Sequence, residues 1–207
     1  MLQVQRFVNE LMSSNCYVLY DVLYDDCIVI DTGSEKCIQE QLFFHEKNLN
    51  PTYVILTHEH TDHTWGTNTL IDIYDSKVVC SKICAENLSK ESIAYFSYYY
   101  DDPNYHCCVK RVDIVLEDIK WEINWHNYTL RFFYTPGHSM GSVCFQIENM
   151  LFTGDTWMPY RPFVNKRNGS KELYSKSLQW IKEYAKGKNM TVYPGHGDSF
   201  INLILYS

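Results

Sequence analysis

The stretch His58-Glu59-His60-Thr61-Asp62-His63 follows directly on an apolar run, Tyr53-Val54-Ile55-Leu56. In an extended segment alternate side chains share a face, so His58 and His60 can bind one ion while the residues between them point away from it. Asp62 and His63 come next, at the expected start of a helix over residues 65–73, and approach the same place from another direction. Imidazole and carboxylate are ligand types of a nitrogen and oxygen metal site. Because the spacing is ordered, the stretch predicts a site for two ions rather than a polar loop that is merely rich in histidine.

The bulk composition is that of one folded domain. A chain of 207 residues that is 45% hydrophobic and 15% aromatic can bury a sizeable core, which excludes a disordered protein and predicts a single domain over residues 1–207. The net charge of −7 disfavours a broad contact with nucleic acid or an anionic membrane, so we expect a small-molecule substrate. Residues 1–10 lack the apolar centre of a signal peptide, and no stretch is apolar enough to span a bilayer. We therefore expect a cytoplasmic protein, of unknown oligomeric state.

Most of the eight cysteines are expected to be reduced, small core residues, because several lie inside apolar runs and no pair has Cys-x-x-Cys spacing. The adjacent pair Cys107-Cys108, in a polar and aromatic region, is the one place where a redox role is considered.

The apolar pattern predicts strands that alternate with helices. The expected strands are residues 4–8, 16–20, 27–30, 53–56, 77–80, 112–116, 128–134, 143–147, 151–153 and 191–193. The expected helices are residues 35–46, 65–73, 81–90 with Ser81 as N-cap, and 171–185. The tyrosine-rich stretch 93–106 is interpreted as a packed helix, with an aromatic wall over a pocket as the alternative.

Three later segments each place a candidate ligand beside a glycine, where the backbone must bend sharply close to a metal centre. They are Thr135-Pro136-Gly137-His138, Phe152-Thr153-Gly154-Asp155 and Tyr193-Pro194-Gly195-His196.

Taken in order, the motifs His-x-His-x-Asp-His, Gly-His, Gly-Asp and Gly-His resemble those of the metallo-β-lactamase-fold hydrolases over nearly the whole chain. The resemblance implies an α/β fold, a four-layer αββα sandwich. It also implies that His58, His60 and His138 bind the first metal, that Asp62, His63 and His196 bind the second, and that Asp155 bridges the two. The expected ions are divalent, zinc first and iron or manganese as alternatives, since imidazole and carboxylate suit all three. A bridging hydroxide would be the nucleophile, and Asp62 would help to shuttle the proton.

Other polar residues are weighed against simpler interpretations. Asp31, in Ile30-Asp31-Thr32-Gly33, resembles the family's aspartate at the end of an early strand and would orient a ligand histidine. A plain Asp-Thr-Gly turn is the alternative. His45, His106 and His126 sit in no matching motif and are interpreted as ordinary polar side chains.

The order of motifs looks most like glyoxalase II and its shorter relatives, which favours hydrolysis of a thioester. The bridging Asp155 disfavours antibiotic hydrolysis, because the true β-lactamases of the family lack that bridge. Only eleven residues follow His196 in this sequence, so we expect neither the helical domain that binds glutathione in the longer glyoxalase II enzymes nor recognition of glutathione. Trp65 stands where the family usually has glycine, either at the pocket mouth or packed beneath the loop.

Substrate contacts are expected from residues 158–169, immediately beyond Asp155. Tyr160, Arg161, Lys166 and Arg167 could meet a carboxylate or phosphate there, with Trp157 and Phe163 on the apolar side. A solvated loop is the alternative. The other functions considered are lactone or phosphodiester hydrolysis, a mononuclear-iron persulfide dioxygenase, an RNA endonuclease, and a non-enzymatic metal-binding module.

Overall fold

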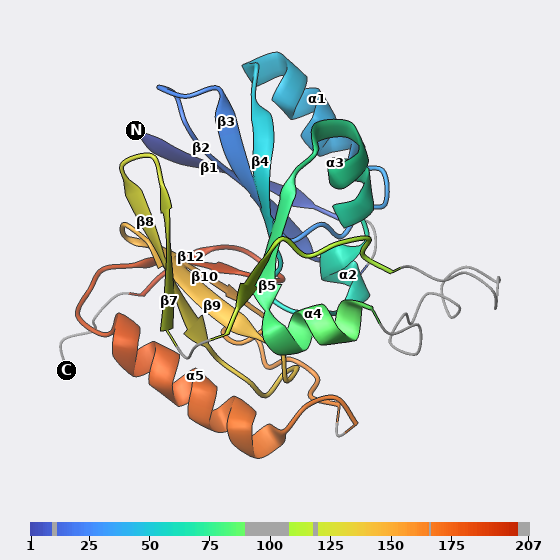
Figure 1. Ribbon diagram of the computed structural model, residues 1–207. Coiled ribbons are helices and arrows are strands. Elements are labelled where there is room, and N and C mark those ends of the chain that lie inside the picture. The colour runs from blue at the N-terminus through green and yellow to red at the C-terminus, as the bar shows by residue number, and fades with distance from the viewer. Residues whose placement is uncertain (10–11, 90–107, 118–119, 166, 203–207) are drawn as a thin grey trace. The chain divides into compact units, whose positions relative to one another are not determined.

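The computed structural model describes residues 1–9, 12–89, 108–117, 120–165 and 167–202 (Figure 1). Contacts between Cα atoms divide the chain into two compact units, Met1–Val115 and Leu116–Ser207. Each unit contains one six-stranded mixed sheet, and the predicted α/β class is confirmed. The prediction of a single domain over residues 1–207 stays a prediction.

The sheet of the first unit has the order β1-β2-β3-β4-β5-β6. Its strands are β1 (Leu2–Val8), β2 (Asn15–Asp21), β3 (Asp26–Ile30), β4 (Asn50–Ile55), β5 (Lys77–Ser81) and β6 (Ile114–Leu116). The pairs β1–β2 and β2–β3 are antiparallel, whereas β3–β4 and β4–β5 are parallel. The parallel pairs need crossover connections, and helices supply them. Helix α1 (Ile38–Lys47) connects β3 to β4, and α2 (Thr61–Thr64) and α3 (Thr67–Tyr74) connect β4 to β5. Helix α4 (Lys82–Leu88) follows β5.

Helices α1 and α3 lie side by side along the first sheet (Figure 1), where the rings of Phe44 and Tyr74 meet edge to face at 5.6 Å. Phe44 and Leu70 are buried in one cluster with Val54 and Val78 from the sheet. Because the helices cover the buried apolar residues of the parallel strands, this cluster forms the core of the unit.

The second unit has the sheet order β12-β11-β10-β9-β8-β7. Its strands are β7 (Lys120–Trp125), β8 (Tyr128–Tyr134), β9 (Val143–Ile147), β10 (Met150–Gly154), β11 (Thr191–Pro194) and β12 (Phe200–Ile201). Strands β7 to β10 form an antiparallel meander, and β10 pairs in parallel with β11 after the long helix α5 (Lys171–Ala185). Ile181 and Ala185 of α5 are fully buried in a cluster with Leu151 and Val192.

Most predicted elements are confirmed to within a few residues, and β8, β9 and α5 have the predicted bounds. Ser81 caps α4 as predicted, accepting the backbone N–H of Cys84 at 3.2 Å. Helix α1 begins at Ile38 rather than at residue 35, because Cys37 has left-handed backbone with φ 45°. Strands β7 and β12 and the separate turn of helix α2 were not predicted. The tyrosine-rich stretch 93–106 lies outside the described residues.

The predicted core role of the cysteines is confirmed where the structure describes them. Cys16, Cys27, Cys37, Cys80, Cys84 and Cys144 are buried free thiols, and Cys108 is half-buried. Cys107 lies outside the described residues, so the redox role of the pair stays untested.

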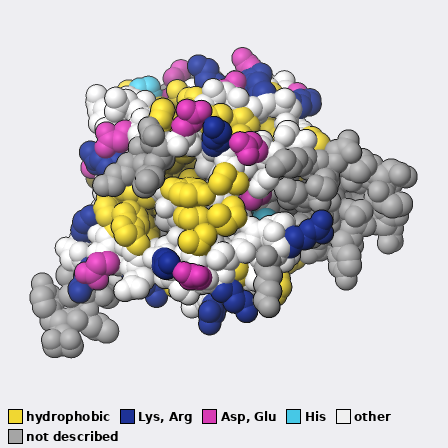
Figure 2. All heavy atoms as spheres, turned by 60° about the horizontal axis from the view of Figure 1, so that its bottom comes forward, with side chains coloured by type: hydrophobic (Ala, Val, Ile, Leu, Met, Phe, Trp, Pro, Cys, Tyr) yellow, Lys and Arg dark blue, Asp and Glu magenta, His cyan; other side chains and the backbone are white. Residues whose placement is uncertain are grey.

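The described helices include none that is both long and apolar enough to cross a membrane. On the face drawn in Figure 2, basic and acidic side chains are interspersed rather than gathered into one basic area.

The packing of α3 predicts a sharp difference between two aliphatic truncations on the same helix. Leu70 is fully buried, so Leu70→Ala should lower the free energy of unfolding by about 2–5 kcal/mol. Ile73 is 54% exposed, so Ile73→Ala should change it by less than about 1 kcal/mol. Urea unfolding followed by circular dichroism measures both, and equal losses would contradict the described burial.

Candidate metal centre

The sheet of the first unit brings Asp31 to the segment that holds four predicted ligands. Strands β3 and β4 are parallel with Ile30 opposite Ile55, so the residues that follow them emerge at the same edge. Asp31 follows β3 there, and His58 lies three residues beyond the end of β4. The backbone N–H of Asp31 donates to the carbonyl of Ile55 at 2.9 Å, which holds the two ends together.

The buried carboxylate of Asp31 accepts three hydrogen bonds. They come from the backbone N–H of Thr57 at 2.8 Å, from the hydroxyl of Thr57 at 2.8 Å and from Nδ1 of His63 at 2.9 Å. Asp31 therefore orients a predicted ligand, as the resemblance implies. The turn interpretation also holds, because Asp31 has a left-handed φ of 58°. Both roles belong to one residue.

These bonds fix which ring nitrogen of each histidine can bind a metal. His63 donates its Nδ1 proton to Asp31, so its Nε2 keeps the lone pair. The hydroxyl proton of Thr57 is also given to Asp31, so its oxygen accepts from Nδ1 of His58, 3.0 Å away. Nε2 of His58 is then a lone-pair donor as well. One carboxylate thus sets the tautomer of two imidazoles, one of them through Thr57.

The donor atoms of this group lie at ligand spacing. Nε2 of His58 is 3.1 Å from Nδ1 of His60, and Nε2 of His63 is 3.5 Å from a carboxylate oxygen of Asp62. Two ligands of a tetrahedral zinc ion with bonds of 2.0–2.1 Å are separated by about 3.3 Å. Both distances fall close to that value. Glu59 contacts another partner, since its carboxylate accepts from the side-chain amide of Asn87 on α4 at 2.9 Å.

Close backbone approach around Gly33 holds this segment against Asp31. A Cβ atom at Gly33 would lie 2.2 Å from the carbonyl oxygen of Asp62 and 2.3 Å from the hydroxyl of Ser14. That hydroxyl donates to the Asp62 carbonyl at 2.5 Å. The backbone N–H of Thr32 donates to the carbonyl of His63 at 2.7 Å. Gly33 is therefore required by contact, because no larger residue fits between these groups.

The second unit gathers the other three predicted ligands, again at strand ends. Strands β10 and β11 are parallel with Gly154 opposite Pro194, so Asp155 and His196 follow them at one edge. His138 lies in the turn between β8 and β9 at that same edge, because β9 runs antiparallel to β10.

One oxygen of Asp155 faces both histidines of this group. Oδ2 lies 3.2 Å from Nε2 of His138 and 3.6 Å from Nε2 of His196. All three side chains are 10% exposed or less. An oxygen at this spacing from two imidazole nitrogens belongs to a group of side chains that can act as metal ligands. The bridging of two ions by Asp155 stays a prediction.

Turn geometry holds His138 in this group. Gly137 has a φ of 142°, and a Cβ atom there would lie 2.1 Å from the backbone nitrogen of Tyr174, in the first turn of α5. The carbonyl of Gly137 accepts from the backbone N–H of Ser170 at 2.8 Å, and the hydroxyl of Ser177 donates to the carbonyl of Pro136 at 2.7 Å. The start of α5 therefore packs directly on the turn that carries His138.

The predicted ligands thus form one group in each unit. His58, His60, Asp62 and His63 belong to the first unit, and His138, Asp155 and His196 belong to the second. Their assignment to two shared ions stays a prediction. His45 and His126 are exposed, which agrees with their interpretation as ordinary polar residues, and His106 lies outside the described residues. No role was predicted for Thr57, although a hydroxyl directly before the first histidine of the motif was an available signal.

The family comparison decides the identity of the fold. The family model of the Metallo-beta-lactamase superfamily matches residues 10–196. The chain belongs to this superfamily. The structure of the BLEG-1 B3 metallo-beta-lactamase matches it with a TM-score of 0.85 at 24% identity, covering 97% of this chain and 94% of that one. At that identity the similarity shows the fold alone, and it confirms the predicted fold class.

Two relatives carry functional names. A probable polyketide biosynthesis zinc-dependent hydrolase, BaeB of Bacillus velezensis, is 29% identical over 91% of this chain and 75% of its own length. A hydroxyacylglutathione hydrolase of Pelagibacter ubique is 27% identical over 73% of this chain and 54% of its own length. The chain therefore spans about half of the second relative.

The Asp31 contacts predict a defect in metal binding without loss of the fold. Asparagine tolerates the left-handed backbone at position 31, so Asp31→Asn should fold. Its neutral amide cannot replace the charged oxygen that accepts from both Thr57 and His63, so zinc affinity should fall by about 10–100-fold. The matched control is Asp26→Asn at the other end of β3, where the carboxylate accepts a long hydrogen bond from the hydroxyl of Thr52 at 3.3 Å. Competition with a chromophoric chelator measures the affinity. If both variants bind zinc equally well, Asp31 does not orient the ligand.

Proposed function

We propose that the protein is a dinuclear metal-dependent hydrolase that cleaves a small thioester. The observation that carries the proposal is Asp155 Oδ2, which lies within 3.6 Å of Nε2 of both His138 and His196. The resemblance assigns these two histidines to different ions, so a carboxylate oxygen between them suits two ions rather than one. The names of the zinc-dependent hydrolase and the hydroxyacylglutathione hydrolase support hydrolysis, and the second of them supports a thioester.

The donor set fits divalent ions. Five imidazoles and two carboxylates are nitrogen and oxygen ligands of the kind that zinc, iron and manganese accept, with zinc as the proposed metal. Donor pairs lie 3.1–3.6 Å apart within each group, close to the separation around a tetrahedral ion. Divalent ions bound there would lower the pKa of a water molecule and polarise the substrate carbonyl.

The chain's own residues prepare this chemistry before substrate arrives. Asp31 and Thr57 hold His58 and His63 in the tautomer that binds metal, so no reorientation is needed. Asp62 has a side chain 18% exposed, against 7% for Asp155. Asp62, the more accessible of the two carboxylates, is therefore the one proposed to accept and pass on the proton during the reaction.

A cytoplasmic setting, a small-molecule substrate and the absence of nucleic-acid or membrane partners are part of the same proposal. The seven described cysteines are free thiols, six of them buried, as expected for a protein kept in a reducing compartment.

A substrate panel tests the reaction. Metal-replete protein should hydrolyse thioesters faster than lactones or phosphodiesters, and His58→Ala should lower kcat/KM by about 100-fold or more, because it removes a ligand. The matched control is His45→Ala, an exposed histidine on α1 that should keep full activity. Absence of turnover in all three substrate classes would overturn the proposal. One iron per chain together with oxygen consumption on a persulfide would instead support the dioxygenase.

Metal content tests the bridging role separately. Because Asp155 faces both histidines of its group, Asp155→Asn should reduce the content from two ions per chain towards one, as measured by mass spectrometry of the dialysed protein. Glu148→Gln, an exposed change in the turn between β9 and β10, should keep both ions. Two tightly held ions in Asp155→Asn would contradict a bridging carboxylate.

A further inference from the structure

We propose that a groove along α5 binds the leaving group of the substrate, and that this leaving group is a long thiol arm ending in phosphate, of the phosphopantetheine class. The inference rests on the proposed thioester hydrolysis and names the thiol that is released. It concerns residues of the second unit only.

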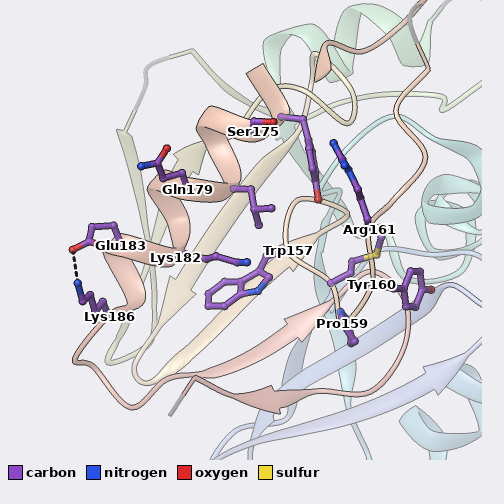
Figure 3. Close-up of a pocket in the computed structure, with 12 residues that line it drawn as sticks. Trp157, Pro159, Tyr160, Arg161, Ser175, Gln179, Lys182, Glu183 and Lys186 are labelled. Carbon is purple, nitrogen blue, oxygen red and sulfur yellow. Dashed lines mark hydrogen bonds and ion pairs between the residues drawn. The ribbon is translucent and has the colours of Figure 1, made fainter. Parts of the chain in front are cut away.

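The groove lies between α5 and the segment that follows β10 (Figure 3), and its volume is about 770 Å³. Trp157 and Arg161 come from the loop side, whereas Gln179 and Lys182 come from α5 (Figure 3). Small-molecule sites have volumes of about 300–1,000 Å³, so the space suits one substrate arm. Of the loop residues predicted to contact substrate, Tyr160 and Arg161 line the groove. Arg167 and Phe163 do not line it, and Lys166 lies outside the described residues.

One end of the groove adjoins the group formed by His138, Asp155 and His196. A Cβ atom at Gly197, the neighbour of His196, would lie 3.4 Å from Pro159 and 3.5 Å from Tyr160. On the helix side, Tyr174 packs against Gly137, the neighbour of His138. Electrostatics agrees with this placement, because burial and then the Asp155 carboxylate raise the pKa of Tyr160. A substrate bound at the group can therefore extend into the groove.

The groove is long. Tyr174, Leu178 and Lys182 recur every fourth position of α5 and so share one face of the helix, and Lys186 directly follows the end of α5. A helix rises about 1.5 Å per residue, so α5 from Tyr174 to its end measures about 17 Å. A fully extended tripeptide measures at most about 11 Å, and a tripeptide thiol attached through its central residue reaches less far. A pantetheine arm is as long as four or five extended residues, about 14–18 Å, and matches the groove.

Basic residues lie at both ends of the groove. Arg161 lies at the end beside Tyr160, and Lys182 and Lys186 lie at the far end, where the one acidic lining residue, Glu183, pairs with Lys186 at 3.4 Å. This cationic lining stands on a chain of net charge −7. Lys182 has its ammonium 5.7 Å from the ring of Trp157, which holds it over the groove. A terminal phosphate suits these cations, whereas an apolar acyl chain does not.

The middle of the groove is mixed. Trp157 and Met158 are buried apolar residues in its floor, and Leu178 adds aliphatic surface. Ser175 and Gln179 offer polar groups along the opposite wall. A phosphopantetheine arm is complementary to this lining. Its amides suit the polar groups, and its branched aliphatic segment suits the apolar residues, before its phosphate reaches the cations.

The test uses a binding probe that cannot act as a thiolate ligand. S-methyl 4′-phosphopantetheine is titrated into the holoprotein by calorimetry beside S-methyl pantetheine, which lacks the phosphate. The phosphorylated probe should bind at least tenfold more tightly, and the difference should shrink as salt is raised. Lys182→Gln should remove most of the difference. Lys176→Gln is the matched control, because Lys176 is an exposed α5 lysine that pairs with Glu172 outside the groove.

Kinetics then separates this inference from the proposed function. Thioesters of the phosphorylated arm should have a KM about tenfold lower than those of pantetheine or glutathione, and Lys182→Gln should raise that KM while kcat stays within about twofold. Equal binding of the two probes, or equal effects of Lys182→Gln and Lys176→Gln, would overturn the inference even if thioesters are hydrolysed. Phosphate-dependent binding without hydrolysis of any thioester would support the groove and overturn the hydrolase.

Discussion

The carboxylate of Asp31 is the constraint on which the first group of ligands depends. It is buried, and a buried carboxylate is costly unless its oxygens accept hydrogen bonds. Thr57 and His63 supply those bonds, and the two that come from side chains also decide the proton position on an imidazole. The cost of burying the charge is thus offset by the same contacts that prepare the ligands. A neutral residue at position 31 would leave the orientation of both histidines to the metal alone.

Sheet topology explains why ligands so distant in sequence form compact groups. In each unit a parallel strand pair ends at one edge, β3 with β4 in the first and β10 with β11 in the second. Side chains that follow these strands therefore meet without long loops to position them. The glycines at positions 33 and 137 then allow the backbone approach that brings the segments into contact, since a Cβ atom at either position would lie within 2.4 Å of a neighbouring atom.

The sequence was sufficient to predict what depends on local pattern. The strand β9 and the helix α5 were predicted with their observed bounds because their apolar periodicity is uninterrupted. Strand β12 has only two residues, which is too short for any period to be recognised. Helix α1 starts late because the backbone at Cys37 turns left-handed, and a cysteine gives no signal of that conformation. Local pattern therefore predicts the type of an element better than its ends.

The candidate site shows the same division between pattern and contact. All seven predicted ligands were named from the order of their motifs, and the structure places these residues in two groups at strand ends, while their binding of metal stays a prediction. The relay through Thr57 could not be predicted, because it depends on which hydroxyl lies 2.8 Å from Asp31 after folding. The groove is also invisible in sequence, since Trp157 and Lys182 come together only when α5 packs beside the segment after β10.

The predicted ligands and the groove along α5 belong to different elements of the structure, so each can change without the other. The ligands follow strands and are held by the backbone hydrogen bonds of the sheets, so the reactive group is rigid and common to the fold. The groove is built from α5 side chains and a loop, where substitutions change charge without disturbing a strand. Members of the superfamily can therefore keep one metal chemistry and differ in the thiol, ester or phosphate that they accept. In this chain cations of α5 line the groove although the net charge is −7, so the groove would attract the anionic end of the proposed substrate locally. Under the proposed function, selection of the substrate by its charged end is then an effect of α5, independent of the groups proposed to cleave the bond.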